Sequence, residues 1–534
     1  MAAYTAVTTF NLADLFEAVA DAVPDREAVV CDGRRLSFAE MDDRATRLAH
    51  VLAARGIGAG DHVGLHLFNG NEYLEAMLAC FKLRAVPVNV NYRYVADELR
   101  YLFADADLVA LLTEPALRTV LDDAATALPR LERGLAWEEA LASASSDRDF
   151  EARSGDDLYV LYTGGTTGMP KGVMWRQEDL FFAALGGGNP GAAPVDAPAQ
   201  VVDRAVAGFH RCLTAPPFMH GASHWMAFQV LLAGGTVVVD RDPGLVPERI
   251  WQLADDERVA FLVVVGDAFA RPLADTLAAA GPDRWPLDAL TAILSGGAIL
   301  SPTVKADLLR LVPQAIVVDG FGASETGGQG QIVSIAGVDA RGAGPGPVRF
   351  VANDDTTAVL GDGFRPVAPG SGELGWVARR GCIPLGYYKD PEKTAETFPV
   401  VDGVRWAIPG DRACVEEDGS VTVLGRGSTS INTGGEKVYP EEVEAVLKAH
   451  PSVFDALVVG VADERWGERV VAVVAPRPDA EVAPTVEVLA AHCRESLAGY
   501  KAPRQVVVVD AVERSPSGKP DYRWAREAAA ASST

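Results

Sequence analysis

The chain has 534 residues, of which 49% are hydrophobic, so it exceeds one ordinary domain and can bury a large core. Its 48 Lys and Arg residues are outnumbered by 73 Asp and Glu residues, and the formal net charge of −25 argues against nucleic acid as a partner. The six cysteines stand singly, and no stretch approaches the roughly 18–20 apolar residues of a membrane-spanning helix. Together with an N-terminus that lacks a signal-like apolar region, these features predict a cytoplasmic protein without stable membrane insertion.

The N-terminal part of the chain alternates between helix and strand patterns. Apolar residues recur at helical spacing over 12–23 and 38–55, and the residues between them predict a short hairpin. Strand, helix and strand patterns follow over 61–90, with a further buried strand at 108–113, which predicts an α/β core with parallel sheets. A segment rich in Gly, Pro and Ala at 186–198 is typical of a surface excursion.

A glycine-rich loop follows the next predicted strand, at 157–161. It reads Tyr162-Thr163-Gly164-Gly165-Thr166-Thr167-Gly168-Met169-Pro170-Lys171-Gly172. Its glycines let backbone N–H groups converge on an anion, its threonines supply hydroxyl donors, and Lys171 adds a positive charge, so the loop is a candidate phosphate cradle. A Walker A loop would need Ser or Thr directly after the lysine, and Gly172 stands there. An ordinary Gly/Thr turn between two strands is the alternative interpretation.

This loop resembles the signature loop of the adenylate-forming enzymes, which include acyl-CoA synthetases, luciferases and peptide-synthetase adenylation domains. Companion motifs recur downstream in the family's order, and the ending Pro520-Asp521-Tyr522-Arg523-Trp524 resembles a bacterial branch of fatty-acyl and steroid-side-chain CoA ligases. The resemblance implies an α/β fold with a large adenylation domain, 1–425, that has parallel sheets and a small β subdomain. A strand-rich region from 372 to 398 matches that subdomain, and a small, mobile α+β lid domain would cover 426–534.

The stretch Pro216-Pro217-Phe218-Met219-His220-Gly221 and the nearby His224 admit two interpretations. The spacing of the two histidines suits a metal pair, but neither an HExxH glutamate nor a third ligand accompanies them. The resemblance implies instead that His220 gates access between the acyl carboxylate and the thiol. Phe218, Trp225 and Met226 would then line the acyl wall. By residue type alone, these apolar side chains are more often core.

Two Gly-rich corners follow predicted strands at 292–295 and 315–319. Ligands of open α/β sheets collect beyond the carboxyl ends of strands, and small residues there let a flat ring approach the backbone. The second corner resembles the family's Tyr-Gly-x-Thr-Glu motif. The resemblance implies that Phe321 packs on adenine, Ser324 reaches phosphate and Glu325 holds Mg²⁺. Unaided by the resemblance, a single loop glutamate is usually just solvated.

The remaining motifs lie toward the C-terminus. The resemblance assigns Asp411 to the ribose hydroxyls, which suits an acceptor-only carboxylate, and Arg426 to ribose and phosphate. Ser428 stands at the hinge position where the family commonly has Asp or Lys. Gly434 and Gly435 match the turn beside the pantetheine tunnel. Lys519, which would otherwise be a surface charge, matches the lysine that enters the active site for adenylation.

The resemblance implies an AMP-forming acyl-CoA synthetase whose cofactors are ATP, Mg²⁺ and CoA and whose partner is a small carboxylic acid. Catalysis is expected from Lys519, Glu325, Thr166 and Lys171, and metal binding from Glu325 and Thr166. The residues expected at the nucleotide and CoA are Thr163, Gly164, Gly165, Thr166, Thr167, Gly168, Lys171, Gly296, Gly297, Ala298, Asp319, Gly320, Phe321, Gly322, Ser324, Asp411, Arg426, Gly434, Gly435 and Lys519. Those expected at the acid are Phe218, His220, Trp225, Met226, Gly266, Gly297 and Gly322.

Two alternatives stay open on sequence alone. One is an adenylating enzyme with another acceptor, such as a carrier-protein pantetheine or oxygen. The other is a nucleotide-binding regulator that has lost catalysis. The sequence leaves the acid open, and a homodimer is only a family-level expectation.

Overall fold

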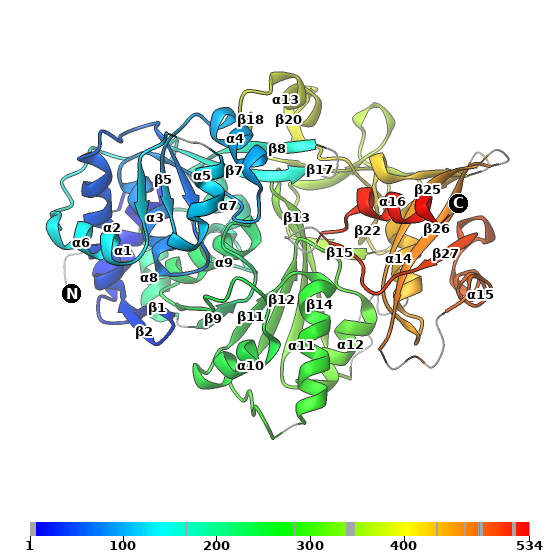
Figure 1. The fold of residues 1–534 in the computed structure, drawn as a ribbon. Coiled ribbons are helices and arrows are strands. Elements are labelled where there is room, and N and C mark those ends of the chain that lie inside the picture. The colour runs from blue at the N-terminus through cyan, green and yellow to red at the C-terminus, as the bar shows by residue number, and fades with distance from the viewer. Residues whose placement is uncertain are drawn as a thin grey trace.

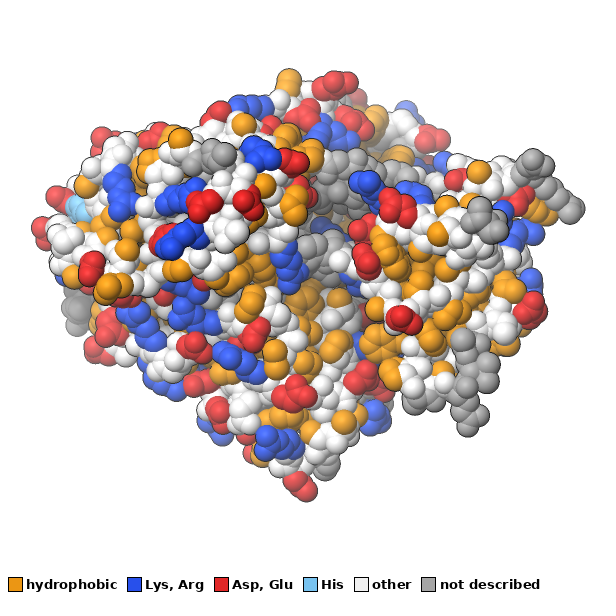
Figure 2. All heavy atoms as spheres, viewed as in Figure 1, with side chains coloured by type: hydrophobic (Ala, Val, Ile, Leu, Met, Phe, Trp, Pro, Cys, Tyr) orange, Lys and Arg blue, Asp and Glu red, His pale blue; other side chains and the backbone are white. Residues whose placement is uncertain are grey.

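The computed structural model describes residues 7–124, 127–165, 168–208, 210–281, 283–337, 348–433, 436–463, 466–478, 480, 484–514 and 519–532. Within these ranges the strands form three sheets, and no helix is both long and apolar enough to cross a membrane. Figure 1 shows a large body made of the N-terminal and middle parts of the chain, with the C-terminal elements in a smaller lobe on the right. Among the side chains that Figure 2 colours by type, basic and acidic residues are interspersed over the visible face rather than gathered in one basic patch.

The N-terminal sheet confirms the predicted strand and helix alternation. In spatial order it contains β18 (Gly386–Tyr387), β8 (Gly168–Arg176), β7 (Leu158–Gly165), β4 (Val86–Asn89), β3 (His62–His66), β5 (Leu108–Thr113) and β6 (Arg130–Glu132). β3 to β7 pair in parallel, whereas β7 and β8 form an antiparallel hairpin. The helices between these strands are α3 (Asn71–Lys82), α4 (Ala96–Asp105), η1 (Pro115–Leu117), α5 (Arg118–Asp123) and α6 (Leu135–Ser143). The glycine-rich loop therefore connects β7 and β8, the two strands of this hairpin.

The largest sheet changes from parallel to antiparallel pairing in its middle. In spatial order it contains β19 (Val400–Val401), β20 (Val404–Ala407), β17 (Gly375–Arg380), β21 (Asp411–Val415), β22 (Val421–Arg426), β15 (Val348–Ala352), β14 (Gly327–Ile335), β13 (Ile316–Ala323), β12 (Ala292–Gly296), β11 (Phe261–Val264), β9 (Arg211–Thr214), β10 (Thr236–Val239), β1 (Glu27–Cys31) and β2 (Arg34–Ser37), and β16 (Thr357–Leu360) pairs with β17. Pairing is parallel from β1 through β13, and antiparallel from β13 through β14 and β15 onward. The β13–β14 turn is thus the junction between the α/β core and the β subdomain.

Helices cover these sheets. The helices before β23 not yet given are α1 (Leu12–Ala22), α2 (Phe38–Ala53), α7 (Gln177–Ala184), η2 (Gly186–Gly188), α8 (Ala199–Ala207), α9 (Gly221–Leu232), α10 (Pro247–Asp256), α11 (Gly266–Ala280), α12 (Pro302–Leu311), η3 (Asp362–Phe364), α13 (Pro391–Thr397) and η4 (Gly427–Thr429). The Asn11 side chain caps α1, and Ser37 with Glu40 forms a capping box on α2, which explains why both predicted helices begin there.

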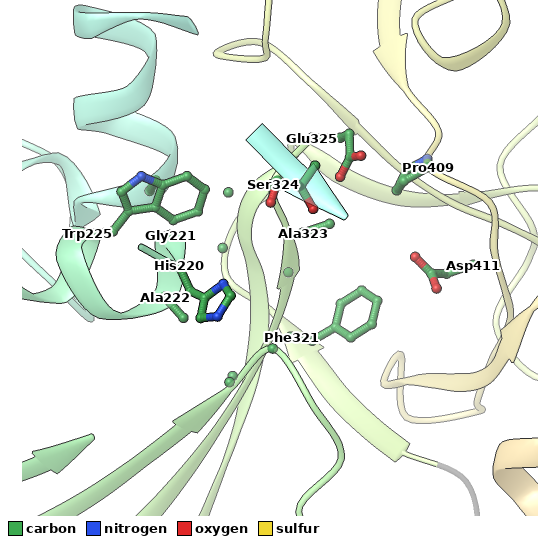
Figure 3. A pocket seen from close by; sticks show the side chains of 18 of the residues that line it. His220, Gly221, Ala222, Trp225, Phe321, Ala323, Ser324, Glu325, Pro409 and Asp411 are labelled. Carbon is green, nitrogen blue, oxygen red and sulfur yellow. The ribbon is translucent and has the colours of Figure 1, made fainter. Parts of the chain in front are cut away.

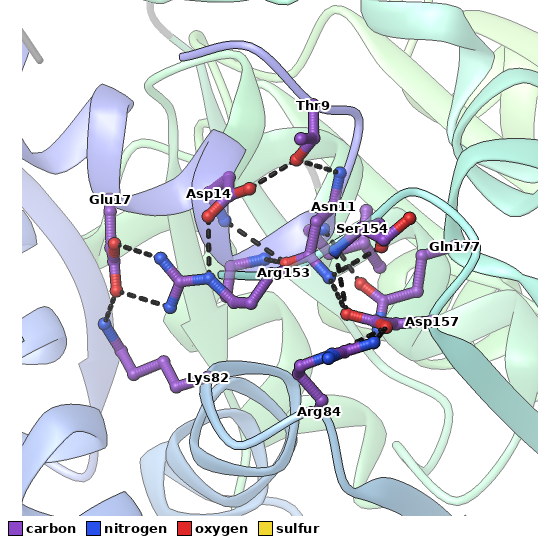
Figure 4. Close-up of polar contacts among 12 residues, drawn as sticks. Thr9, Asn11, Asp14, Glu17, Lys82, Arg84, Arg153, Ser154, Asp157 and Gln177 are labelled. Carbon is purple, nitrogen blue, oxygen red and sulfur yellow. Dashed lines mark hydrogen bonds and ion pairs between the residues drawn. The ribbon is translucent and has the colours of Figure 1, made fainter. Parts of the chain in front are cut away.

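A buried charge network ties the first helices together (Figure 4). Lys82 of α3 is 0% exposed, and its Nζ donates to Glu17 Oε1 at 2.5 Å and to Asp42 Oδ1 at 2.7 Å. Arg153, in the segment before β7, donates to Glu17 and to Asp14. A buried lysine is tolerated only when it is paired, so this network fixes how α1, α2 and α3 pack together.

The C-terminal lobe is an α+β unit, as predicted. Its sheet has the order β24 (Glu436–Val438), β23 (Ile431–Thr433), β26 (Gly467–Pro476) and β25 (Val453–Asp463), with β27 (Gln505–Val508) parallel to β26. Its helices are α14 (Pro440–Lys448), α15 (Val486–Ser496), η5 (Gly499–Lys501) and α16 (Tyr522–Ala531). One face of the sheet packs on α14 and α15 and the other on α16. β22 ends at Arg426 and β23 begins at Ile431, and the domain boundary at 425/426 stays a prediction.

An ion pair joins the lobe to the body. Lys448 Nζ of α14 lies 3.8 Å from Asp267 Oδ2 of α11 and 3.5 Å from Asp455 Oδ1 of its own lobe. Asp267 also accepts a hydrogen bond from the backbone N–H of Ser301, at 2.8 Å. Asp455 in turn accepts two hydrogen bonds from Arg514. The lobe is therefore held against α11 by charges that each have a second partner.

One sequence-based expectation for local structure was confirmed and one was wrong. The segment 186–198 lies mostly at the surface, as predicted; it contains η2, and residues 186 and 189–194 also line a cavity. Residues 394–398, placed in a strand-rich region, lie in or directly after α13. The Asp390 side chain caps this helix and Pro391 begins it, and these two residues are the helix-start signal in the sequence.

Candidate functional site

A large cavity opens where the two big sheets and the C-terminal lobe meet. Its volume is about 2720 Å³, and its walls come from the β7–β8 hairpin, α9, the ends of β12 and β13, the β20–β21 connection and the lobe. In Figure 3, His220 and Trp225 lie on one side of this space, Ser324 and Glu325 in the middle, and Pro409 and Asp411 on the other side. The cavity therefore brings together motifs that lie about 360 residues apart in the chain, Thr163 and Lys519 among them.

The glycine-rich loop contributes Thr163 and Lys171 to the cavity wall. The Lys171 Nζ donates to Asp390 Oδ2 at 2.5 Å, and this pair holds the pKa of Asp390 below its usual value. The backbone pairs Gly165 with Gly168 across the β7–β8 hairpin, so the loop joins two antiparallel strands. Thr166 and Thr167 lie outside the described residues, and Gly164 is described only as part of β7. Asp390 is a partner that the sequence did not single out.

Small residues line the cavity at the ends of β12 and β13. Gly296 pairs with Gly320 in register, and both line the cavity with Gly297 and Ala298. A Cβ built at Gly297 would meet no atom nearer than 4.0 Å, so this corner leaves open space for a flat group.

The carboxylate at the end of this wall is buried beside a lysine. Asp319 pairs with Lys305 at 3.2 Å. Burial raises the pKa of Asp319, and the charge of Lys305 opposes that rise. Asp319 therefore already has a cationic partner within the protein.

A β-bulge directs the next residues into the cavity. The register of β13 against β14 shifts between Phe321 and Gly322, and a Cβ at Gly322 would lie 2.2 Å from the Gly327 carbonyl oxygen. Only glycine fits so close an approach. Phe321 stacks on Phe350 with ring centroids 4.6 Å apart, and Phe321 and Gly322 line the cavity. Beyond the bulge, Ser324 reaches the cavity while its carbonyl accepts a hydrogen bond from the Trp175 indole at 3.0 Å.

Glu325 presents a carboxylate to the cavity. The Tyr387 hydroxyl donates to its Oε1 at 2.9 Å, and its Oε2 accepts no hydrogen bond from any residue that the structure describes. One carboxylate with a free oxygen beside the candidate phosphate cradle fits Mg²⁺, which usually takes one or two carboxylates with phosphate and water oxygens. Across the described ranges, no group of three or more His, Cys, Asp or Glu side chains would hold a metal without such help.

The predicted acyl wall is placed only in part. His220 precedes α9 and lines the cavity with Trp225 and Met226. Phe218 does not, because it is 0% exposed within the main hydrophobic core. Gly266 begins α11 behind the wall, where a Cβ would lie 2.4 Å from the Ile299 carbonyl oxygen. These two residues shape the backbone that supports the cavity.

The nucleotide and lid residues also converge. Asp411 lines the cavity and pairs in register with Arg426 across β21 and β22. Lys519 lines the cavity too, and its positive charge acts on His220. Gly434 and Gly435 lie outside the described residues, as does the side chain of Arg426.

Three histidines with lowered pKa values predict a loss of stability in weak acid. Burial lowers the pKa of His66 to about 4, of His220 to about 3 and of His224 to about 4. The unfolded chain binds protons at these histidines below about pH 6.5 while the folded chain does not, so the free energy of unfolding should fall as pH drops from about 6.5 to 4. Urea unfolding at several pH values measures this slope.

A pair of variants separates this effect from the titration of carboxylates. The slope should become shallower in His66→Leu, because that variant removes one proton-binding difference, and should be unchanged in a variant of the exposed His210. An unchanged slope in His66→Leu would contradict the assignment.

Family models match most of the chain. The model described as "AMP-binding enzyme" matches residues 16–388, and the model described as "AMP-binding enzyme C-terminal domain" matches residues 442–519. The second match ends at the lysine that reaches the cavity from the C-terminal lobe.

Relatives of known activity are similar over nearly the full length. The 3-oxocholest-4-en-26-oate–CoA ligase of Rhodococcus rhodochrous is 47% identical over 538 residues, covering 97% of this chain and 95% of that protein. The medium/long-chain-fatty-acid–CoA/3-oxocholest-4-en-26-oate–CoA ligase of Mycolicibacterium smegmatis is 46% identical, covering 97% and 96%. The anthranilate CoA ligase AuaEII in complex with anthranoyl-AMP shares the fold at 21% identity, with a TM-score of 0.81 and coverage of 99% of both chains.

Proposed function

The chain belongs to the AMP-binding enzyme family, and we propose that it is an ATP-dependent acyl-CoA ligase for medium- to long-chain or steroid-side-chain acids. The observation that carries the chemistry is that Lys519, Glu325 and His220 line one cavity although they come from three distant parts of the chain. The near full-length similarity to ligases of such acids supports the substrate class.

In the first half-reaction, an oxygen of the acid attacks the α-phosphorus of ATP, and the bond to the bridging oxygen of pyrophosphate breaks. Negative charge gathers on the oxygens around phosphorus, where fixed positive groups lower the barrier most. Lys519 and Lys171 both line this cavity and would supply that charge, with the Ser324 hydroxyl as a donor. Mg²⁺ bound at Glu325 would neutralise phosphate charge and orient the leaving pyrophosphate.

The nucleoside part of ATP would lie toward the β subdomain. Asp411 would accept hydrogen bonds from the ribose hydroxyls, and Arg426, its register neighbour, would lie near ribose and phosphate. The open corner at Gly296, Gly297 and Gly320 leaves room for adenine, and Phe321 forms a flat apolar side of that space.

In the second half-reaction, the CoA thiol attacks the acyl carbonyl, the bond to AMP breaks, and acyl-CoA forms. Lys519 and a pantetheine arm cannot occupy the same side of that carbonyl at once, so residues 426–534 would have to turn as a lid. His220 would separate the acyl side from the thiol side. Burial keeps its pKa near 3, so it remains neutral near pH 7 and does not compete with Lys519 as a cation.

The acyl side of the cavity has room for a bulky acid. Trp225 and Met226 form one wall, and residues 186 and 189–194 form another. Gln229 lies one helical turn beyond Trp225 on α9 and also lines the cavity. Use of ATP and CoA as co-substrates fits action in the cytoplasm, which is part of this proposal.

The test is pyrophosphate release with ATP, Mg²⁺ and CoA across acetate, short, medium and long fatty acids, aromatic acids and sterol side-chain acids. We expect release coupled one-to-one to acyl-CoA formation, strongest with medium to long chains or sterol side-chain acids. Pyrophosphate release without thioester formation would show that the acyl acceptor is not CoA but another group, such as a carrier-protein pantetheine or oxygen. ATP binding without any pyrophosphate release would favour the alternative of a nucleotide-binding regulator.

A further inference from the structure

A buried chain of hydrogen bonds lies directly behind the acyl wall. The Trp225 indole N–H donates to the Tyr159 hydroxyl oxygen at 3.1 Å. The same hydroxyl lies 2.5 Å from His224 Nε2, and His224 Nδ1 lies 2.6 Å from the Phe218 carbonyl oxygen. These hydrogen bonds therefore connect the cavity wall, through Tyr159 of β7, to the turn that precedes His220.

The donors and acceptors of this chain have one consistent direction. A carbonyl oxygen only accepts, so His224 Nδ1 carries the hydrogen and donates to Phe218. Burial lowers the pKa of His224 to about 4, so the ring is neutral near pH 7 and its Nε2 accepts. Tyr159 must then donate to Nε2, which leaves its oxygen lone pairs facing the indole N–H. Every polar hydrogen in this chain of hydrogen bonds has one acceptor.

The surroundings make these bonds hard to replace. Tyr159 is 2% exposed and His224 is 1% exposed. Their neighbours are aromatic: the Tyr73 ring lies 6.4 Å from the His224 ring, and the Phe81 ring lies 6.5 Å from the Tyr159 ring. Water cannot substitute for a missing partner in such a site, so loss of one hydroxyl leaves a donor and an acceptor unpaired.

We propose that Tyr159 and His224 are positioning residues that hold the Trp225 indole in its place in the acyl wall and hold the Phe218–His220 turn. By doing so, they set the selectivity of the enzyme for bulky acids. The inference rests on the proposed ligase function. Trp225 is half-buried and lines the cavity, so an indole released from Tyr159 would rotate into the space that a ring-containing acid needs. A slender fatty acid would meet this obstacle less.

Tyr159→Phe removes the central hydroxyl and keeps the ring. We expect its KM for a sterol side-chain acid to rise about three- to tenfold relative to wild type, the scale of losing one buried hydrogen bond. Its KM for a linear fatty acid, its KM for ATP and its kcat should change by less than about twofold. Tyr73→Phe is the matched control, because its ring packs on the same histidine while its hydroxyl is outside the chain.

A double-variant cycle tests whether Tyr159 acts through the indole. Trp225→Phe removes the N–H, so adding Tyr159→Phe to it should change the KM ratio of the two acids little further. Additive effects would overturn the proposal, as would an equal shift of the ratio in Tyr73→Phe. An unchanged ratio in Tyr159→Phe would overturn it as well.

A readout that needs no activity separates this inference from the ligase function. In protein labelled with ¹⁵N-tryptophan, the indole resonance that disappears in Trp225→Phe should exchange slowly with solvent in wild type and in Tyr73→Phe, and at least tenfold faster in Tyr159→Phe. If no acid yields acyl-CoA, the ligase proposal fails while this exchange pattern still supports the anchoring of Trp225. Equal exchange in wild type and Tyr159→Phe would overturn the anchoring itself.

Discussion

Lys519→Ala should slow formation of the acyl adenylate about a hundred- to a thousandfold, the scale for losing one preorganised donor to transition-state charge. Lys519 lines the cavity that contains Glu325 and Ser324, and its charge acts on His220. In the proposed second half-reaction the lid has turned and this lysine no longer faces the carbonyl. Thioester formation from preformed acyl adenylate should therefore fall much less.

The two half-reactions are measured separately, by exchange of labelled pyrophosphate into ATP and by transfer from synthetic acyl adenylate to CoA. Arg494→Ala is the matched control, since Arg494 is an exposed cation on α15 of the same lobe and does not line the cavity. Equal loss in both half-reactions of Lys519→Ala would refute the assigned role.

Lys82→Met should lower the free energy of unfolding of the N-terminal part by about 3–5 kcal/mol, the scale for removing one partner of a buried ion pair. Lys82 is fully buried and donates to Glu17 (Figure 4) and also to Asp42. Met fills nearly the same volume, so the loss comes from two carboxylates whose remaining cationic partners, among the described residues, are Arg153 and Arg148.

Urea unfolding followed by far-UV circular dichroism measures this loss. Lys393→Met is the matched control, because Lys393 forms an exposed pair with Glu396, and such surface pairs contribute only about 0–1 kcal/mol. Stability of Lys82→Met within about 1 kcal/mol of wild type would show that the arginines alone satisfy the two carboxylates.

Elements with strong local patterns could be predicted from the sequence. The strands β3, β4 and β5 are short segments with apolar residues, and α3 between β3 and β4 has helical spacing, so the parallel core followed from these patterns. The position of the candidate site followed as well, since ligands of such sheets collect at the carboxyl ends of strands. β12 and β13 do end in the small residues that line the cavity.

Contacts between distant segments could not be predicted in this way. Asp390 reaches Lys171 across 219 residues, and Tyr387 reaches Glu325 across 62 residues, so neither pair leaves a local signal. Phe218 and Trp225 are both large and apolar, and only the backbone turn before α9 decides which one faces the cavity. The burial of Lys82 leaves no local signal either, because its two carboxylate partners lie on other helices.

The ion pair between Lys448 and Asp267 bears on the energy balance of the lid. If residues 426–534 turn between half-reactions, this contact breaks, yet Lys448 keeps Asp455 within 3.5 Å and Asp267 keeps the Ser301 N–H. Neither charge is stranded without a partner, so the separation avoids most of the penalty that a single buried ion pair would impose. This ion pair alone would therefore not hold the lid in one orientation. A preference of pyrophosphate for one lid orientation and of CoA for the other would then shift the lid between the two orientations during turnover.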